Sequence, residues 1–105
     1  MENMFNTARN FNQPIGNWDV SNVTTMFGMF YFADEFNQPL GDWNVSNVND
    51  MAGMFRASDA ANFNQNLSSW DVSGVNLCSD FCLNASEWTL PKPNFTNCSD
   101  ALGCE

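Results

Sequence analysis

Apolar and polar residues change their spacing halfway through a unit that recurs along this chain. In the segment 43–46 the two kinds of residue alternate, which predicts a short β-strand with one buried face. In the segment 48–55 apolar residues fall three or four apart, which predicts an apolar stripe along a short helix. Pro39 and Gly41 precede the strand and predict a turn. Each unit is therefore expected to contain a turn, a strand, a corner, a short helix and a return loop.

The unit recurs with a period of about 25 residues. The sequence Phe-Asn-Gln-Pro-Ile-Gly-Asn-Trp-Asp-Val-Ser-Asn-Val at 11–23 returns in closely similar form at 36–48 and at 63–75. The sequence Met-Phe-Gly-Met-Phe at 26–30 likewise has counterparts at 51–55 and 78–82. Residues 1–5 match these, so the chain is expected to begin in the middle of a repeat.

This register predicts two regions. The first is a repeat region over 1–82, consisting of a half repeat at 1–10 and repeats at 11–35, 36–62 and 63–82. The second is an irregular C-terminal cap over 83–105. One unit is too small to bury its apolar face alone, so successive units are expected to stack as the coils of an α/β solenoid. The spacing L-x-x-W-x-V-x-x-V has the form of a leucine-rich repeat with Trp in one Leu place.

Equivalent apolar positions are expected to meet in the core of such a stack. The predicted core residues are Trp18, Trp43, Trp70, Val20, Val45, Val72, Met26, Met51, Met29 and Met54. The Trp residues could instead bind sugars by stacking. They are expected to point to the same side of the strand as the Val residues, however, which favours a place in the core. Asn12, Asn37 and Asn64 are expected to form an amide ladder at the corner.

Charge and composition exclude several classes of function. Twelve acidic residues face only Arg9, Arg56 and Lys92, for a net charge of −9, which argues against binding to nucleic acid or to an anionic membrane. There is no His, which removes the commonest general base and metal ligand, and no apolar run is long enough to span a membrane. Neither an enzyme nor a bound cofactor is expected.

Two kinds of site can be considered on the outward surface. Asp19, Asp42 and Asp71 could hold Ca²⁺, a cation that prefers several oxygen ligands, although a solvated acidic face is the favoured interpretation. Six N-x-S/T sequons begin at Asn22, Asn44, Asn66, Asn84, Asn94 and Asn97. Those at Asn22, Asn84, Asn94 and Asn97 are retained as glycosylation candidates, the last three because they lie outside the regular repeat.

All four Cys residues lie late in the sequence, at Cys78, Cys82, Cys98 and Cys104. A four-thiolate zinc site would require convergent ligands, and this spacing is loose for one. An even count in an acidic chain favours two disulfides that tie the tail over the last repeat. A tail that runs back across the repeat would pair Cys82 with Cys98 and Cys78 with Cys104.

The motif W-D-V-S-x-V-x-x-M-x-x-M-F followed by F-N-Q-P-L resembles the repeat domain of unknown function found in mycoplasmal surface lipoproteins, akin to BspA-like leucine-rich surface proteins. The resemblance covers about residues 1–81. It implies a right-handed, leucine-rich-repeat-like stack of strand–short-helix coils, placement at the cell surface or outside the cell, and a role in adhesion or surface structure. It implies no enzymatic residues.

Two non-catalytic functions are therefore expected. The first is a structural protein that assembles head to tail through an open N-terminal end, with itself or with further repeats, as a filament or surface layer. The second is an adhesin-type module that binds a host protein or glycan through its outward face.

Overall fold

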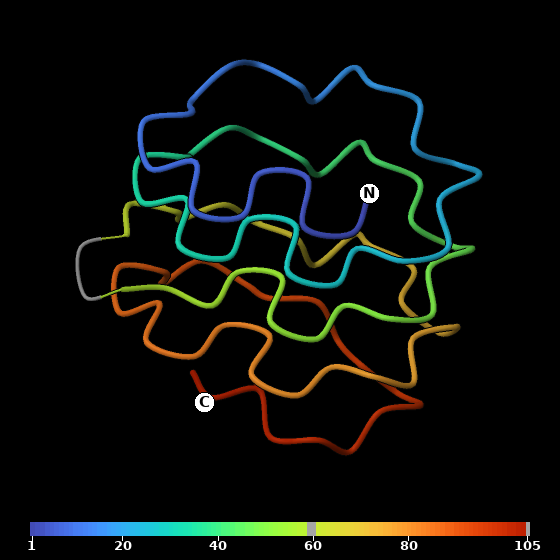
Figure 1. The fold of residues 1–105 in the computed structure, drawn as a ribbon. Helices are drawn as coiled ribbons and strands as arrows, with labels where there is room; N and C mark the ends of the chain where they lie inside the picture. The colour runs from blue at the N-terminus through green and yellow to red at the C-terminus, as the bar shows by residue number, and fades with distance from the viewer. Residues whose placement is uncertain (59–60, 105) are drawn as a thin grey trace.

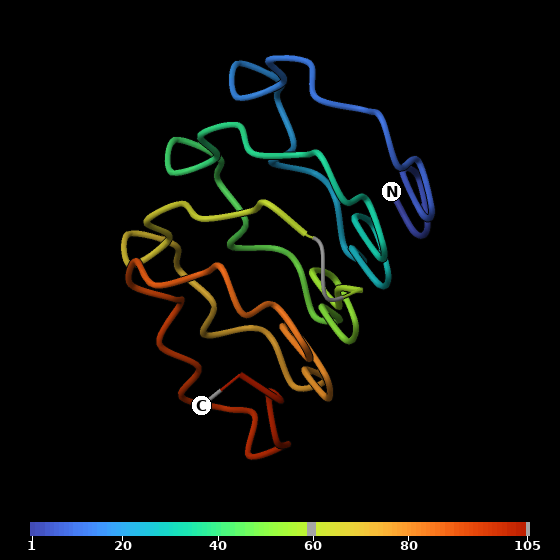
Figure 2. The ribbon, with the colours of Figure 1, turned by 90° about the vertical axis from the view of Figure 1, so that its left-hand side faces the viewer.

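Successive repeats lie one above another, from the N-terminal layer at one end to the C-terminal tail at the other (Figure 1, Figure 2). This computed structural model describes residues 1–58 and 61–104. The Cα atoms have a radius of gyration of 12.1 Å and extents of 30 × 28 × 22 Å. The chain is thus a compact body in which equivalent residues of neighbouring repeats come close together.

The predicted α/β solenoid is wrong, because none of the described residues forms an α-helix or a named β-strand. Neither the strand expected at 43–46 nor the helix expected at 48–55 is present. Within the described residues, sheet pairing consists of two isolated parallel bridges, between Thr25 and Asp50 and between Asp50 and Leu77. The leucine-rich-repeat-like, right-handed stack of strand–short-helix coils is therefore not supported, whereas the disulfide-tied C-terminus is present.

A ribbon of tight turns takes the place of the expected helix. In the repeat 11–35 the N–H of Met29 donates to the carbonyl of Met26, three residues earlier, at 3.1 Å, and Tyr31 and Ala33 make the equivalent bonds. The N–H groups between them point to the next layer, where Phe30 donates to Met54 at 2.9 Å. An α-helix would direct nearly every N–H to its own segment, and here about every second one joins two layers.

In the first turn of each layer, and not in the turn that follows it, the third residue has a left-handed backbone. Its φ is 62° at Gly28, 63° at Gly53, 56° at Asn3 and 57° at Asp80. Gly, Asn and Asp are the residues that tolerate this conformation best. Their recurrence at this position is a sequence signal for turns in place of a helix.

Side chains join the layers in the first half of each repeat. The carboxamide oxygen of Asn12 accepts the backbone N–H of Asn37 at 2.9 Å, and Asn37 does the same for Asn64. The indole N–H of Trp43 donates to the carbonyl of Ile15 at 3.0 Å. The Asn column therefore links layers through side-chain-to-backbone bonds, which leaves no need for a continuous strand ladder.

Most of the predicted core positions are buried. The set with at most 5% exposure is Trp43, Trp70, Val20, Val45, Val72, Met26, Met51, Met29 and Met54. Trp43 and Trp70 stack with centroids 6.4 Å apart and nearly parallel rings. Trp18 departs from the expectation, because it is 38% exposed and, among the described residues, its ring lies near that of Phe5 alone, at 6.0 Å between centroids.

Phe side chains form further stacks that the predicted core omitted. One runs through Phe5, Phe30 and Phe55 with centroids 5.6 and 5.3 Å apart. A second includes Phe36 and Phe63, 5.9 Å apart. Repetition of the same ring at the same register places each aromatic face on its counterpart in the next layer.

Disulfides hold the tail to the last repeat, but in the order opposite to the one expected. Cys78 pairs with Cys98 and Cys82 with Cys104, not Cys82 with Cys98 and Cys78 with Cys104. The reason is the direction of the tail, which runs parallel to the layer above it. Asp80 donates to Ala101 and the N–H of Cys82 to the next residue along the tail, Leu102, each at 3.0 Å.

Candidate interaction surfaces

The acidic residues considered for Ca²⁺ do not converge. A carboxylate oxygen of Asp19 accepts both the N–H and the hydroxyl of Ser21, at 3.0 and 2.6 Å, and Asp71 is occupied in the same way by Ser73. The hydroxyl bond from the Ser, followed by the backbone bond, lowers the pKa of each of these two carboxyl groups. Each side chain therefore closes its own turn, and Asp42 lies apart from them in a groove described below.

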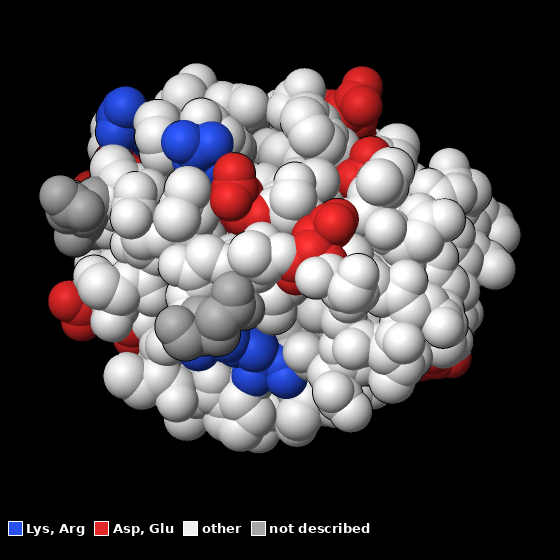
Figure 3. All heavy atoms as spheres, turned by 90° about the horizontal axis from the view of Figure 1, so that it is seen from below, with Lys and Arg blue, Asp and Glu red and all other residues white. Residues whose placement is uncertain are grey.

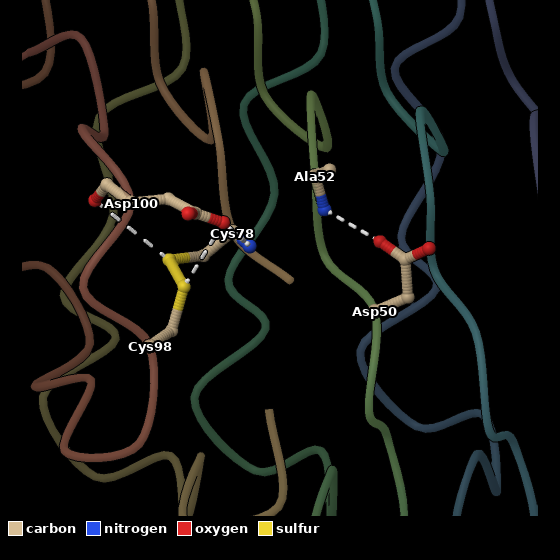
Figure 4. Close-up of a disulfide and its surroundings, with 5 residues drawn as sticks. All are labelled: Asp50, Ala52, Cys78, Cys98 and Asp100. Atoms are coloured by element: carbon tan, nitrogen blue, oxygen red, sulfur yellow. Dashed lines mark hydrogen bonds between the residues drawn. A yellow bond between two sulfur atoms is a disulfide. The ribbon is translucent and has the colours of Figure 1, made fainter. Parts of the chain in front are cut away.

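In the described part of the chain, one cluster of three side chains has ligand atoms close enough together to hold a metal ion, but two of its members form a disulfide. It consists of Cys78, Cys98 and Asp100. The two sulfur atoms are bonded to each other, and the Asp100 carboxylate accepts the N–H of Cys78 at 3.3 Å (Figure 4). All four Cys residues are in disulfides, so the zinc alternative has no thiolate ligands left.

All three cationic side chains have partners. Arg9 pairs with Asp34 at 2.6 Å, and Arg56 lies 3.7 Å from Asp80. Lys92 donates to the carbonyl of Trp88 at 2.9 Å and lies over the ring of that residue. Seen from below, the surface is mainly uncharged, with basic and acidic groups scattered over it (Figure 3).

The glycosylation candidates differ in whether the Asn side chain makes a hydrogen bond. Asn22, Asn84 and Asn94 are exposed, and none of the three makes a side-chain hydrogen bond within the described residues. Asn97 is also exposed, but its amide donates to the carbonyl of Ser73 at 2.5 Å and so helps to attach the tail.

The N-terminal and C-terminal faces of the molecule differ in their backbone groups. Each layer receives N–H groups from the layer before it, as Phe27 and Met29 receive those of Asn3 and Phe5. The corresponding carbonyls of the first layer, at Glu2 and Met4, accept no hydrogen bond from any described residue. The side chain of Met4 is 51% exposed.

The C-terminal face has its donors occupied by the tail. The N–H groups of Asp80 and Cys82 donate to Ala101 and Leu102, and that of Cys78 donates to the Asp100 side chain. The tail therefore ends the pattern of layer-to-layer bonds at this face.

A groove of about 810 Å³ crosses the corners of three successive repeats. Its lining includes Pro14, Asn17, Trp18, Gln38, Pro39 and Asp42. The sequence pattern did not indicate it, because the groove depends on how the Pro-x-Gly corners of neighbouring layers sit against each other.

Repeated layers of similar sequence and a disulfide-tied tail define the class as a repeat protein. A family model described as a Mycoplasma protein of unknown function, DUF285, matches residues 1–95, and the chain belongs to this family. The match supports the expected mycoplasmal repeat family and leaves the likeness to BspA-like proteins untested. No curated protein and no solved structure matches the chain. Within the described residues, no helix has the length and apolar character needed to cross a membrane.

Proposed function

We propose that this protein is a non-enzymatic structural repeat protein of the cell surface or extracellular space that associates with a second copy through its N-terminal face. The observation that carries the proposal is the exposed apolar side chain of Met4 at this face. Two disulfides favour an oxidising, extracellular compartment.

The apolar character of this face comes from the same columns that form the core. Met29 and Met54, the counterparts of Met4, are 0% exposed where another layer covers them. Phe5 and Phe11 stack at 4.0 Å just inside the face and are only partly buried. Covering Met4 would remove apolar area from water, which favours association by about 25 cal/mol per Å² of such area.

Face-to-face pairing is supported better than head-to-tail growth. A head-to-tail contact would continue the ladder only if the C-terminal face offered free N–H groups, and the tail occupies those of Asp80 and Cys82. Two N-terminal faces instead offer each other matching apolar surfaces. Such a contact uses the same patch on both copies, so it closes as a dimer and does not extend into a filament.

A non-enzymatic role fits the electrostatics of the described residues. General acid–base catalysis needs a carboxyl group placed in a cleft with its pKa raised toward neutrality. At Asp19 and Asp71 the hydrogen bonds of the turns that these residues close lower the pKa of the carboxyl group.

Sedimentation velocity over a range of concentrations tests the association. The expected result is a reversible dimer that Met4→Asp weakens tenfold or more, because the substitution places two carboxylates in the contact. Leu90→Asp is the matched control, since Leu90 is 42% exposed and lies in the tail. A monomer at every concentration would overturn the proposal, and so would filaments that lengthen with concentration, which indicate head-to-tail growth.

The second candidate function is adhesion, with a host protein or a glycan as the ligand. The groove at Trp18 favours the glycan, because it places an exposed indole beside uncommitted polar side chains.

A further inference from the structure

We propose that the groove lined by Trp18, Asn17, Gln38 and Asp42 is a binding site for an uncharged glycan. The proposal deepens the second candidate function by naming the site and the ligand class. It does not depend on dimerisation through Met4.

The indole of Trp18 differs from the other indoles of the chain. Those of Trp43, Trp70 and Trp88 each donate their N–H to a backbone carbonyl, at 3.0, 2.8 and 2.8 Å. Trp18 makes no such bond within the described structure, and the residue is 38% exposed. The groove lining therefore includes an exposed aromatic residue whose N–H has no partner among the described residues.

Aromatic faces carry negative potential, and they attract the weakly positive C–H face of a sugar ring. Pro14 and Pro39 add two further apolar surfaces to the same lining. A ligand held here needs one apolar face, which a pyranose ring has.

Polar groups beside the indole are available to sugar hydroxyls. The side chains of Asn17 and Asp42 are exposed and make no hydrogen bond with any described residue. The amide nitrogen of Gln38 donates to the side-chain oxygen of Asn12 at 3.0 Å, which orients the amide and leaves its own oxygen free. Hydroxyl groups can donate to Asp42 and Gln38 and accept from Asn17.

The charge of the groove and of the whole chain favours uncharged ligands over anionic ones. The lining contains one carboxylate and no cationic side chain, and the whole chain has a net charge of −9. Phosphate, sulfate and acidic sugars would be repelled. An uncharged, polyhydroxylated ring with one apolar face satisfies both the aromatic and the polar parts of the groove.

Binding is tested with a panel of immobilised neutral oligosaccharides, built from glucose, mannose, galactose or N-acetylglucosamine, and an acidic oligosaccharide for comparison. For any neutral oligosaccharide retained, titration calorimetry with the soluble form gives Kd. We expect binding to at least one neutral member and no binding to the acidic one. Trp18→Ala should weaken binding tenfold or more, and Asp42→Asn should weaken it severalfold. Both variants should keep the thermal unfolding temperature of the parent within a few degrees.

Phe27→Ala is the matched control, because Phe27 is a similarly exposed aromatic residue outside the groove lining. Intrinsic fluorescence supplies a second readout, since Trp18 is the exposed indole and its emission should shift on binding. Failure of every neutral oligosaccharide to bind would overturn the proposal, as would binding that survives both substitutions. Met4→Asp should leave glycan binding unchanged, so failure of dimerisation and failure of glycan binding are distinguished.

Discussion

At the scale of single residues, a short polar turn explains why equivalent positions of successive repeats hold either Asp or Asn. The side-chain oxygens of Asp19, Asn44 and Asp71 each accept the N–H and hydroxyl of the Ser two positions later. An amide oxygen accepts these bonds as a carboxylate does, so either residue closes the turn. The column therefore serves local structure, which is why it collects no cation site.

The depressed pKa of Asp19 predicts a dependence of stability on pH. The unfolded chain takes up a proton near the ordinary value of 3.8, before the folded chain does. The contribution of this carboxylate is therefore complete above that value and is lost as pH falls through the lower folded pKa. We expect the free energy of unfolding to decrease with acidification below about pH 4.

Carboxyl NMR titration of a Ser21→Ala variant checks the cause. Loss of the hydroxyl bond should move the pKa of Asp19 up toward 3.8, while Asp71, which keeps Ser73, should titrate as in the parent. Unchanged titration of Asp19 would contradict the assignment.

At the scale of elements, the turn ribbon shows why apolar spacing alone misleads. Met26, Met29 and Phe30 point to the core with helix-like spacing, yet their segment has no helical bonds. Spacing records which side chains are buried, and a chain of tight turns can bury the same set as a helix. What separates the two is the left-handed residue in the first turn of each layer.

Two Gly→Ala substitutions test this element. Gly28 and Gly53 have nearly equal positive φ, so Ala should cost each about 1 kcal/mol of backbone strain. At Gly28 the new methyl group would also collide with the side-chain oxygen of Asn3, whereas at Gly53 it would meet Tyr31 Cδ2 at an ordinary 3.6 Å. Urea unfolding should show the larger loss for Gly28→Ala. Equal losses would rule out the Asn3 contact, and a gain in stability at both positions would argue for a helix.

At the scale of the whole molecule, the tail acts as a final layer attached by covalent bonds. It provides acceptors to the last repeat where a further repeat would otherwise do so, and Trp88 donates back to Gln65. Both disulfides lie against the core, with Cys78 and Cys82 fully buried. The tail thereby covers one end of the aromatic stack.

Removal of either disulfide should destabilise the fold. The sequence separations are 20 and 22 residues, for which loss of the cross-link costs about 3 kcal/mol. The paired variants are Cys78→Ala with Cys98→Ser, and Cys82→Ala with Cys104→Ser, which leave no free thiol from the broken bond. Chemical denaturation gives the loss, and hydrogen exchange should show faster exchange at the N–H of Asp80 and Cys82. Unchanged exchange would contradict the tail's role as an acceptor layer.

The sequence by itself determined the repeat period, the family and the burial of the Val and Met columns, because side chains at equivalent positions meet the same surroundings in every layer. It also indicated that disulfides tie the tail to the last repeat. Only the tertiary structure decided where the backbone hydrogen bonds go, in which order the Cys residues pair, and that Trp18 faces a groove. Those features depend on how whole layers are placed against one another, and the apolarity of a residue carries no information about which segment accepts its N–H.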